Sequence, residues 1–194
     1  PQVGLSKADM VVEELVEGGL TRLAVFYYSQ LPDVAGPIRS MRASDIGIVK
    51  PVNGEMVTSG AAGQTIARLN GAGVKFHQEG QIKGLYRESG RSSLYSVMAD
   101  MPTIAEQLEA ESERPQDYLP WGDAADLPKG QPATSVQASF GGHTTNWAFE
   151  DGHYVNKNTY AAADDQFLAD SVLVLEVQVG DAGYRDPGGN PVPE

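Results

Sequence analysis

Cysteine is absent from this chain of 194 residues, and so are long apolar runs. Without cysteine there are no disulfide bonds, thiolate nucleophiles or zinc–thiolate sites, although this absence does not identify the cellular compartment. No apolar run approaches the roughly 20 residues that a membrane-spanning helix needs, and the N-terminus has neither a basic start nor an apolar signal segment. We therefore expect the chain, as given, to be soluble.

Basic residues are scarce in the second half of the chain. Residues 1–100 hold 10 Lys and Arg against 10 Asp and Glu, whereas residues 101–194 hold 4 against 16. The whole net charge of -12 therefore lies in the second half. An acidic surface repels nucleic acids and anionic membrane headgroups, whose phosphates bind to clustered basic residues. Nucleic acid is not expected as a partner.

Recognisable catalytic and metal-binding motifs are lacking as well. The chain has no Gly-x-Ser-x-Gly nucleophile elbow, no Walker loop and no dinucleotide-binding fingerprint. The histidines His77, His143 and His153 follow no metal-ligand spacing such as His-Glu-x-x-His. We predict no metal, no cofactor and no catalytic residue, so a non-enzymatic role is favoured over an enzymatic one.

What the chain does contain is the pattern of a mixed α/β fold, and its hydrophobic content of 41% is enough for a core. Residues 114–132 are rich in proline and poor in apolar side chains, which is typical of a linker or a long surface crossover. We expect an N-terminal α/β domain at residues 1–113 and a smaller strand-rich C-terminal domain at residues 133–194. Insertion of strands from residues 133–179 into the sheet formed by residues 10–80 would contradict this division.

The first domain begins with a predicted hairpin. Gly18 and Gly19 separate two segments with strand character, and both glycines can take positive φ, so we expect strands at about residues 10–17 and 20–28. Further elements are expected as a helix at about 41–49 with Ser40 as its N-cap, a strand at 55–58, a helix at 64–70 ended by Gly71, a strand at 74–77 and a helix at 102–112.

The second domain is expected to consist mainly of strands. Apolar and β-branched residues predict strands at 134–140, 145–149, 153–156 and 171–179, with Asp151 and Gly152 as a hairpin turn. The last stretch, residues 180–194, is rich in glycine and proline, and we expect it to be extended or frayed.

Arginines gather in two short motifs of the first quarter. Arg22 ends the run Glu-Gly-Gly-Leu-Thr-Arg, and Arg39 and Arg42 belong to the run Gly-Pro-Ile-Arg-Ser-Met-Arg. A guanidinium group is a planar, permanently charged fork that suits phosphate or carboxylate. Because Arg39 and Arg42 lie three residues apart, they would share a face of the expected helix. These arginines therefore predict an anion site.

A glycine-containing loop adds backbone donors to the predicted site. Ser59, Gly60 and Gly63 lie between a predicted strand and a predicted helix, where unpaired N–H groups at a helix N-terminus can bind an anion. Arg87 and Arg91 lie in a later stretch that also contains arginines, and they complete the predicted ligand-binding set.

The alternative is that each arginine pairs with a nearby carboxylate, stabilises the fold and binds nothing. The candidate carboxylates are those of Glu14, Glu17 and Asp45. Arginines that converge without acidic partners would support an anion site, whereas one-to-one ion pairs would argue against it.

Several segments resemble a known family. Residues 4–9 (Gly-Leu-Ser-Lys-Ala-Asp), residues 16–22 (Val-Glu-Gly-Gly-Leu-Thr-Arg) and residues 36–42 occur in an order that resembles the YerB-like family of bacterial envelope lipoproteins. This family has no known function, and the resemblance implies an N-terminal α/β domain followed by a smaller strand-rich domain. Ser92 and Ser93 depart from the family pattern, which has Pro-His-Asn at that place.

The resemblance also implies an extracytoplasmic location in the bacterial cell envelope, with membrane attachment through a segment absent from this chain. The chain looks truncated at both ends relative to the family. We expect an envelope protein that binds a phosphate-bearing glycan or lipid through the arginine cluster.

Two alternatives stay open. One is a non-enzymatic accessory subunit of a membrane-associated envelope complex, in which the acidic half meets a basic partner surface. The other is a transferase or hydrolase that acts on phosphorylated envelope polymer, by a chemical analogy with the LytR-CpsA-Psr proteins. A bound anion would favour the expected ligand-binding role or the enzyme, whereas a large apolar contact patch would favour the accessory subunit.

Overall fold

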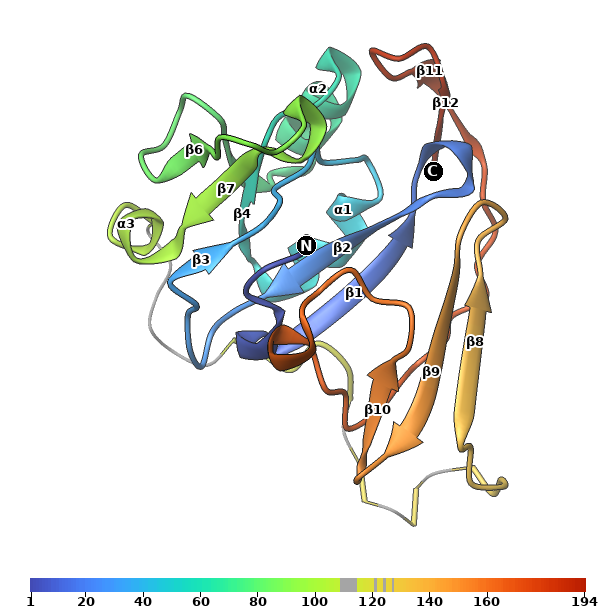
Figure 1. Ribbon diagram of the computed structural model, residues 1–194. Helices are drawn as coiled ribbons and strands as arrows, with labels where there is room; N and C mark the ends of the chain where they lie inside the picture. The colour runs from blue at the N-terminus through green and yellow to red at the C-terminus, as the bar shows by residue number, and fades with distance from the viewer. Residues whose placement is uncertain (109–114, 121, 124, 127) are drawn as a thin grey trace.

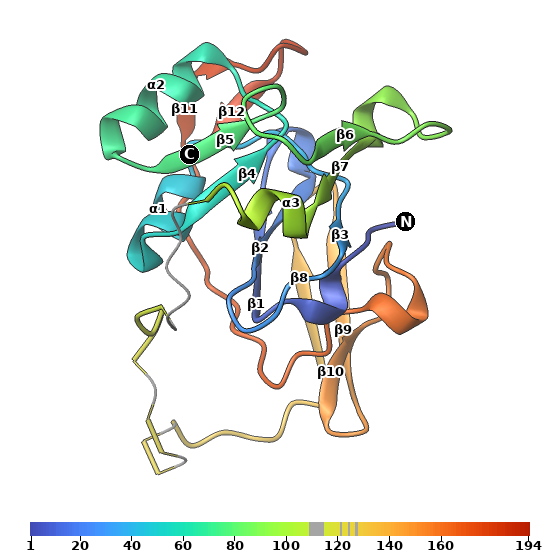
Figure 2. The ribbon, with the colours of Figure 1, turned by 90° about the vertical axis from the view of Figure 1, so that its left-hand side faces the viewer.

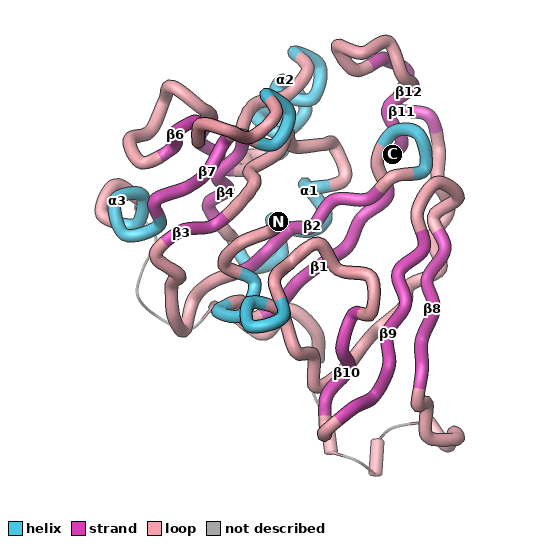
Figure 3. The backbone as a smooth tube through the Cα atoms, viewed as in Figure 1, coloured by secondary structure: helices cyan, strands magenta, loops and turns pink. Residues whose placement is uncertain are grey.

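The computed structural model describes residues 1–108, 115–120, 122–123, 125–126 and 128–194. It is a mixed α/β structure built from several small sheets and short helices (Figure 1; Figure 3). Short 3₁₀ turns lie at Leu5–Lys7, Glu17–Gly19, Lys50–Val52, Ser93–Tyr95 and Ala163–Asp165. The expected α/β fold class, with strands dominating the C-terminal part, is confirmed.

The predicted N-terminal hairpin is present. Strands β1 (Met10–Leu15) and β2 (Thr21–Phe26) pair antiparallel, with Met10 opposite Phe26 and Leu15 opposite Thr21. The connection is a 3₁₀ turn rather than a two-residue turn, and Gly18 and Gly19 have φ of 72° and 71° within it. The strand character of the two segments and the positive φ of both glycines therefore determine this element.

A parallel strand pair forms the next unit. Strand β4 (Glu55–Thr58) is followed by helix α2 (Gly63–Ala72), which returns the chain to strand β5 (Lys75–Gln78) beside β4 (Figure 2). Helix α1 (Asp45–Val49) packs nearby. A core cluster holds this unit together through its buried residues Met41, Val49, Leu69 and Val74.

Two predicted boundaries in this unit are wrong. Ser40 does not cap a helix, because residues 39–41 run extended beside the end of β4: Ser59 N–H donates to the Arg39 carbonyl (3.2 Å) and Met41 N–H to the Gly60 carbonyl (3.0 Å). Helix α1 therefore starts later than expected, at Asp45. Helix α2 extends past Gly71 to its C-cap Gly73.

A three-stranded antiparallel sheet was not predicted. It has the order β3 (Val34–Ala35), β7 (Val97–Asp100) and β6 (Leu85–Arg87). Helix α3 (Met101–Ala105) follows at once, and the Asp100 side chain caps it by accepting the Thr103 N–H at 3.1 Å. The predicted helix at 102–112 is thus shorter over its described part, and its residues beyond 108 lie outside the described chain.

The C-terminal part contains a second three-stranded antiparallel sheet, of order β10 (His153–Asn156), β9 (Thr144–Glu150) and β8 (Ser135–Ser139). These strands confirm the predictions to within a residue or two. The turn between β9 and β10 has positive φ at Asp151 (51°) and Gly152 (89°), as the Asp-Gly pair predicts.

One prediction for the last quarter is wrong and one is confirmed in part. Residues 171–179 form no strand, because no partner strand lies beside them in the described chain. Residues 180–194 are largely extended, as expected, but they are not frayed: strands β11 (Asp181–Arg185) and β12 (Pro191–Pro193) form a hairpin that packs against the 3₁₀ turn at Glu17–Gly19. No helix in the described residues has the length and apolar character needed to cross a membrane.

The C-terminal part contacts the first part through side chains, turns and one isolated backbone bridge between Gln2 and Ala161. The Gly142 N–H donates to the Gly19 carbonyl at 2.9 Å, and the Asp165 carboxylate accepts the Gly4 N–H at 2.7 Å. In the described chain, the strands after residue 132 pair with one another and not with β1 to β7. The predicted domain division at residues 114–132 stays a prediction.

Candidate functional site

A cavity of about 250 Å³ lies at the N-terminal end of helix α2, and we call it the α2 cavity. Three of the residues predicted for an anion site line this cavity: Arg42, Ser59 and Gly60. The remaining lining residues are Ser40, Ala61, Ala62, Thr65, Gln78, Asp186, Pro187 and Val192. Residues from the arginine motif, from the glycine-containing loop and from the C-terminal hairpin thus line the same cavity.

Helix α2 presents free backbone donors at this cavity. The residue before the helix, Ala62, is extended (φ -63°, ψ 148°) and supplies no side-chain cap. The first helical hydrogen bond runs from the Ile66 N–H to the Ala62 carbonyl at 3.1 Å. The N–H groups of residues 63–65 therefore precede the helical hydrogen-bond ladder and carry the partial positive charge of the helix N-terminus. The predicted residue Gly63 contributes to the site in this way.

Arg42 is buried and bound to Glu17. Its Nε donates to Glu17 Oε1 at 2.5 Å and its Nη2 to Glu17 Oε2 at 2.7 Å, while Nη1 donates to the Met41 carbonyl at 2.8 Å. This two-bond fork is the ion pair considered as the alternative in the sequence analysis. Arg42 reaches the α2 cavity with its charge, but Glu17 occupies the fork that an external anion would need.

Arg22 lies beside the same network. Its Nη1 donates to the Ser40 carbonyl, the group that Arg42 also approaches at 3.4 Å. Burial, together with the nearby charges of Arg42 and Arg39, lowers the pKa of Arg22 to about 10. Arg42 and Arg39 are therefore close enough to Arg22 to repel its charge, although Arg22 and Arg39 do not line the cavity.

Two acidic groups complete this buried network. Burial raises the pKa of Glu14 to about 8, with the charge of Asp45 as the next cause, and burial also raises the pKa of Asp45. The Asp45 carboxylate accepts the Arg42 N–H at 2.6 Å, and Glu14 accepts the Ser44 hydroxyl at 2.5 Å. Because the two carboxyl groups also hydrogen-bond to each other, they hold a proton between them at neutral pH.

The other predicted arginines lie elsewhere. The Arg39 guanidinium donates to the Leu94 carbonyl and stacks over the Tyr95 ring, 5.2 Å from its centroid. Arg87 makes two hydrogen bonds of 2.7 Å to Glu79, and Arg91 pairs with Glu88. These contacts belong to the sheet of β3, β6 and β7 and to its flanking loops, away from the α2 cavity.

One lining residue, Asp186, was missed at the sequence level. It lies in the turn of the β11–β12 hairpin, which docks on α2 through a 2.8 Å hydrogen bond between Thr65 and Tyr184 and through an Arg68 bond of 2.9 Å to the Ala182 carbonyl. The backbone N–H of Asn190 holds the pKa of Asp186 below its ordinary value, and the Arg42 charge contributes. The sequence signal was present, since Asp-Pro-Gly-Gly-Asn is a turn between two short strand-like runs.

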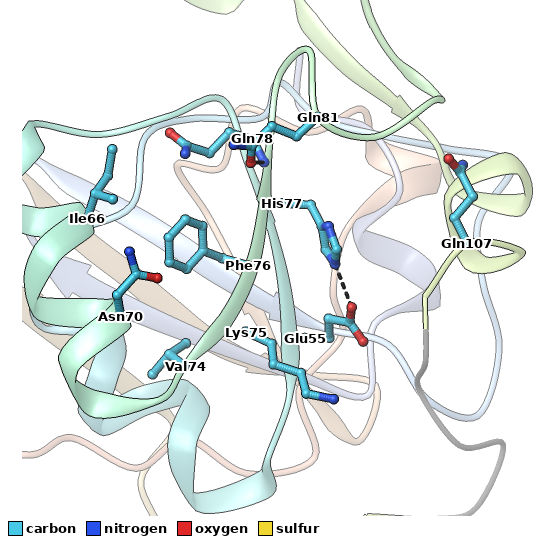
Figure 4. Close-up of a pocket in the computed structure, with 10 residues that line it drawn as sticks. All are labelled: Glu55, Ile66, Asn70, Val74, Lys75, Phe76, His77, Gln78, Gln81 and Gln107. Atoms are coloured by element: carbon cyan, nitrogen blue, oxygen red, sulfur yellow. Dashed lines mark hydrogen bonds and ion pairs between the residues drawn. The ribbon is translucent and has the colours of Figure 1, made fainter.

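A second hollow, of about 520 Å³, lies along strand β5 (Figure 4). It contains His77, whose Nε2 lies 2.5 Å from the Glu55 carboxylate. The other histidines also face acids, His153 at 3.0 Å from Asp170 and His143 at 3.7 Å from Glu13. Among the described residues, no group of three or more metal-ligating side chains gathers at one point.

Comparison with known proteins gives the class of this fold. Residues 1–114 match the family described as "Protein of unknown function (DUF3048) N-terminal domain", and the chain belongs to this family. A stretch of 42 residues is 55% identical to the Bacillus subtilis (strain 168) protein named "Putative lipoprotein YerB". That stretch is 22% of this chain and 13% of the relative.

The crystal structure of YerB from Bacillus subtilis has the same fold, with a TM-score of 0.64 and 23% sequence identity. The match covers 81% of this chain and 56% of the YerB chain. The chain thus spans little more than half the length of that structure. The resemblance to the YerB-like family inferred from the short motifs is confirmed.

Proposed function

We propose that the protein binds a phosphate or carboxylate anion in the α2 cavity. The observation that carries this proposal is the uncapped N-terminus of α2, which opens into a cavity that the buried Arg42 also lines. Backbone N–H groups at a helix N-terminus bind anions through direct hydrogen bonds and through the helix dipole. Ser59 and Gly60, in the loop before the helix, also line this cavity.

The role of the arginines in this proposal differs from the one expected from sequence. Glu17 occupies the Arg42 fork, so the arginine acts through its charge and not through a two-bond contact with the ligand. Arg22 adds a second positive charge behind the Ser40 carbonyl. An anion would therefore receive neutral backbone hydrogen bonds close to the charges of Arg42 and Arg22, with the Asp186 carboxylate as an opposing charge on the wall. Added salt should weaken its binding.

The cellular setting follows from the relative. YerB is named as a lipoprotein, which supports an extracytoplasmic position in the bacterial envelope for this chain, with a membrane anchor in the full-length protein. Anions exposed in that compartment include the phosphate groups of envelope glycans and of lipid headgroups. We propose these phosphate-bearing molecules as the ligand class.

The test uses a substitution whose own carboxylate occupies the backbone donors proposed to bind the anion. Ala62→Asp places a capping carboxylate at the N-cap, where it accepts the N–H groups that the ligand would need, and such caps stabilise helices by about 0.5–2 kcal/mol. The variant should be at least as stable as the wild type and should bind inorganic phosphate and polyprenyl phosphate roughly tenfold more weakly or not at all.

Ala67→Asp is the matched control, because it adds the same charge at an exposed position in the middle of α2. It should leave phosphate affinity nearly unchanged in calorimetric titration. Equal loss of binding in both variants would assign the effect to net charge, and absence of binding by the wild type would refute the proposal.

A second candidate function is that of a non-enzymatic accessory subunit. It is favoured by the exposed apolar side chains of residues 173–179, since contiguous exposed apolar surface marks interaction sites. Under this function the buried arginines only stabilise the fold. A protein that binds no phosphate but associates through residues 173–179 would support this second function over the first.

A further inference from the structure

In the described chain, strand β5 pairs only with β4, so one of its edges has no partner strand. This edge borders the 520 Å³ hollow, which we call the β5 groove. Figure 4 shows the groove following the strand, with Phe76 and Ile66 on the side of α2 and His77 and Glu55 on the other side. An open strand edge with side-chain pockets on both faces is the geometry that accepts an added strand.

The two walls of the β5 groove differ in chemistry. The wall on the side of α2 is mainly apolar and is formed by Ile66, Val74 and Phe76, with Asn70 at its rim. The opposite wall is polar, and its side chains are those of Glu55, Lys75, His77 and Gln107. A strand that fits this groove must be apolar on one face and polar on at least part of the other.

Residues 171–179, which we call the apolar segment, have this pattern. Successive side chains of an extended chain point to opposite faces. One face of the segment begins with Ser171 and is apolar from there on, with Leu173, Leu175, Val177 and Val179. The other face carries Val172 and Val174, then Glu176 and Gln178. With the apolar face against α2, Glu176 and Gln178 lie on the wall that contains Lys75 and His77.

The apolar segment is exposed, although its composition is that of a buried strand. Leu175 and Val177 are both 69% exposed, and no strand of the described chain pairs with the segment. An exposed segment with the composition of a strand and no partner strand can pair with the strand edge of another chain.

The segment cannot reach the β5 groove of its own molecule. Its ends are fixed: the Tyr154 N–H donates to the Ala169 carbonyl at 2.8 Å before the segment, and the Gly180 N–H donates to the Glu194 carbonyl at 2.7 Å after it. In Figure 1 the segment runs along the right-hand side up to β11, whereas β4, the neighbour of β5, lies on the left.

We propose that two copies of this chain associate by placing the apolar segment of one along the β5 groove of the other. The contact joins two different surfaces, the apolar segment and the β5 groove. If each copy places its segment in the groove of the other, the assembly is a closed dimer; if each copy binds a different neighbour, larger assemblies form. Each copy carries the same negative net charge, so added salt should strengthen this association by screening the repulsion. This salt dependence is opposite to that expected for phosphate binding.

The test is sedimentation velocity on the wild type and on three variants across a range of protein concentrations. Leu175→Lys disables the apolar segment, and Asn70→Arg occludes the rim of the groove with a longer side chain at an exposed helical position. Each variant alone should associate roughly tenfold more weakly than the wild type. Leu168→Lys, at an exposed leucine outside the segment, is the control and should associate like the wild type.

Mixing the two disabled variants gives the decisive result. Leu175→Lys keeps an intact groove and Asn70→Arg keeps an intact segment, so an equimolar mixture should form a heterodimer through one remaining contact. A mixture that stays monomeric would overturn the proposal, as would a wild type that is monomeric at every concentration. Association lost in Leu175→Lys but unchanged in Asn70→Arg would also overturn it, because the segment would then bind elsewhere.

Discussion

Replacing Glu14 by glutamine should make the stability of the protein less sensitive to pH. Burial raises the pKa of the Glu14 carboxyl to about 8 in the folded protein, from an ordinary value of 4.5. The folded state therefore holds a proton that the unfolded chain releases between these two pH values. Because the folded state binds more protons, the free energy of unfolding of the wild type falls as pH rises through this interval.

The magnitude follows from the same pKa values. At about 1.4 kcal/mol for each pH unit, the interval from 4.5 to about 8 corresponds to nearly 5 kcal/mol, and sharing of the proton with Asp45 reduces the part that belongs to Glu14. We expect Glu14→Gln to gain on the order of 2–4 kcal/mol relative to the wild type between pH 5 and pH 8.5. Below pH 4.5 this stabilisation of the wild type is fully present, so the two proteins should be similar there.

The assay is urea unfolding followed by circular dichroism at pH 5, 6.5 and 8.5. Glu106→Gln, at an exposed position just after helix α3, is the control for removal of a carboxyl group. A difference between Glu14→Gln and the wild type that stays constant across this range would refute the assignment of the shared proton to the Glu14 and Asp45 pair.

Three further predictions concern the ion pair, the hairpin turn and the α2 cavity. Glu17→Ala should lower the free energy of unfolding by about 3–5 kcal/mol, because it leaves the Arg42 charge buried without its partner; urea unfolding measures this, and a loss below about 1 kcal/mol would contradict it. Gly18→Val should lower the free energy of unfolding by roughly 1 kcal/mol or more, because valine resists the positive φ of this position. Gly19→Val should lower it further in the same assay, because its Cβ would also lie 2.4 Å from the backbone nitrogen of residue 142. Equal losses in the two variants would argue against that contact. Asp186→Asn should raise phosphate affinity roughly two- to tenfold in calorimetric titration by removing a carboxylate from the cavity wall, and unchanged affinity would place the anion elsewhere.

Local patterns predicted those elements whose partners are close in sequence. The β1–β2 hairpin and the turn at Asp151 and Gly152 follow from strand character on either side of residues that accept positive φ. Residues 171–179 show the limit of this reasoning, because strand propensity does not supply a partner strand and none is present in the described chain. Strand β3 has only two residues and pairs with a strand more than 60 positions away, which no local pattern reveals.

The candidate site was predictable in part. The loop before α2 and the buried Arg42 were identified from glycine and arginine patterns, and the Glu17 pair was foreseen as the alternative use of the arginine. Convergence of Asp186 on the same cavity could not be foreseen, because it depends on a hairpin that docks on α2 through residues 119 positions apart. Arg87 and Arg91 join the predicted site by residue type alone, and their carboxylate partners Glu79 and Glu88 lie eight and three positions from them in sequence.

Titration of the ¹⁵N-labelled protein with inorganic phosphate tests the central claim most directly, because the proposal names the amides that touch the anion. We expect the backbone amide signals of Gly63, Gln64 and Thr65 to shift downfield together with a single dissociation constant, and the shifts to disappear in Ala62→Asp. Shifts confined to exposed basic residues such as Lys129, with these three amides unmoved, would contradict an anion site at the N-terminus of α2.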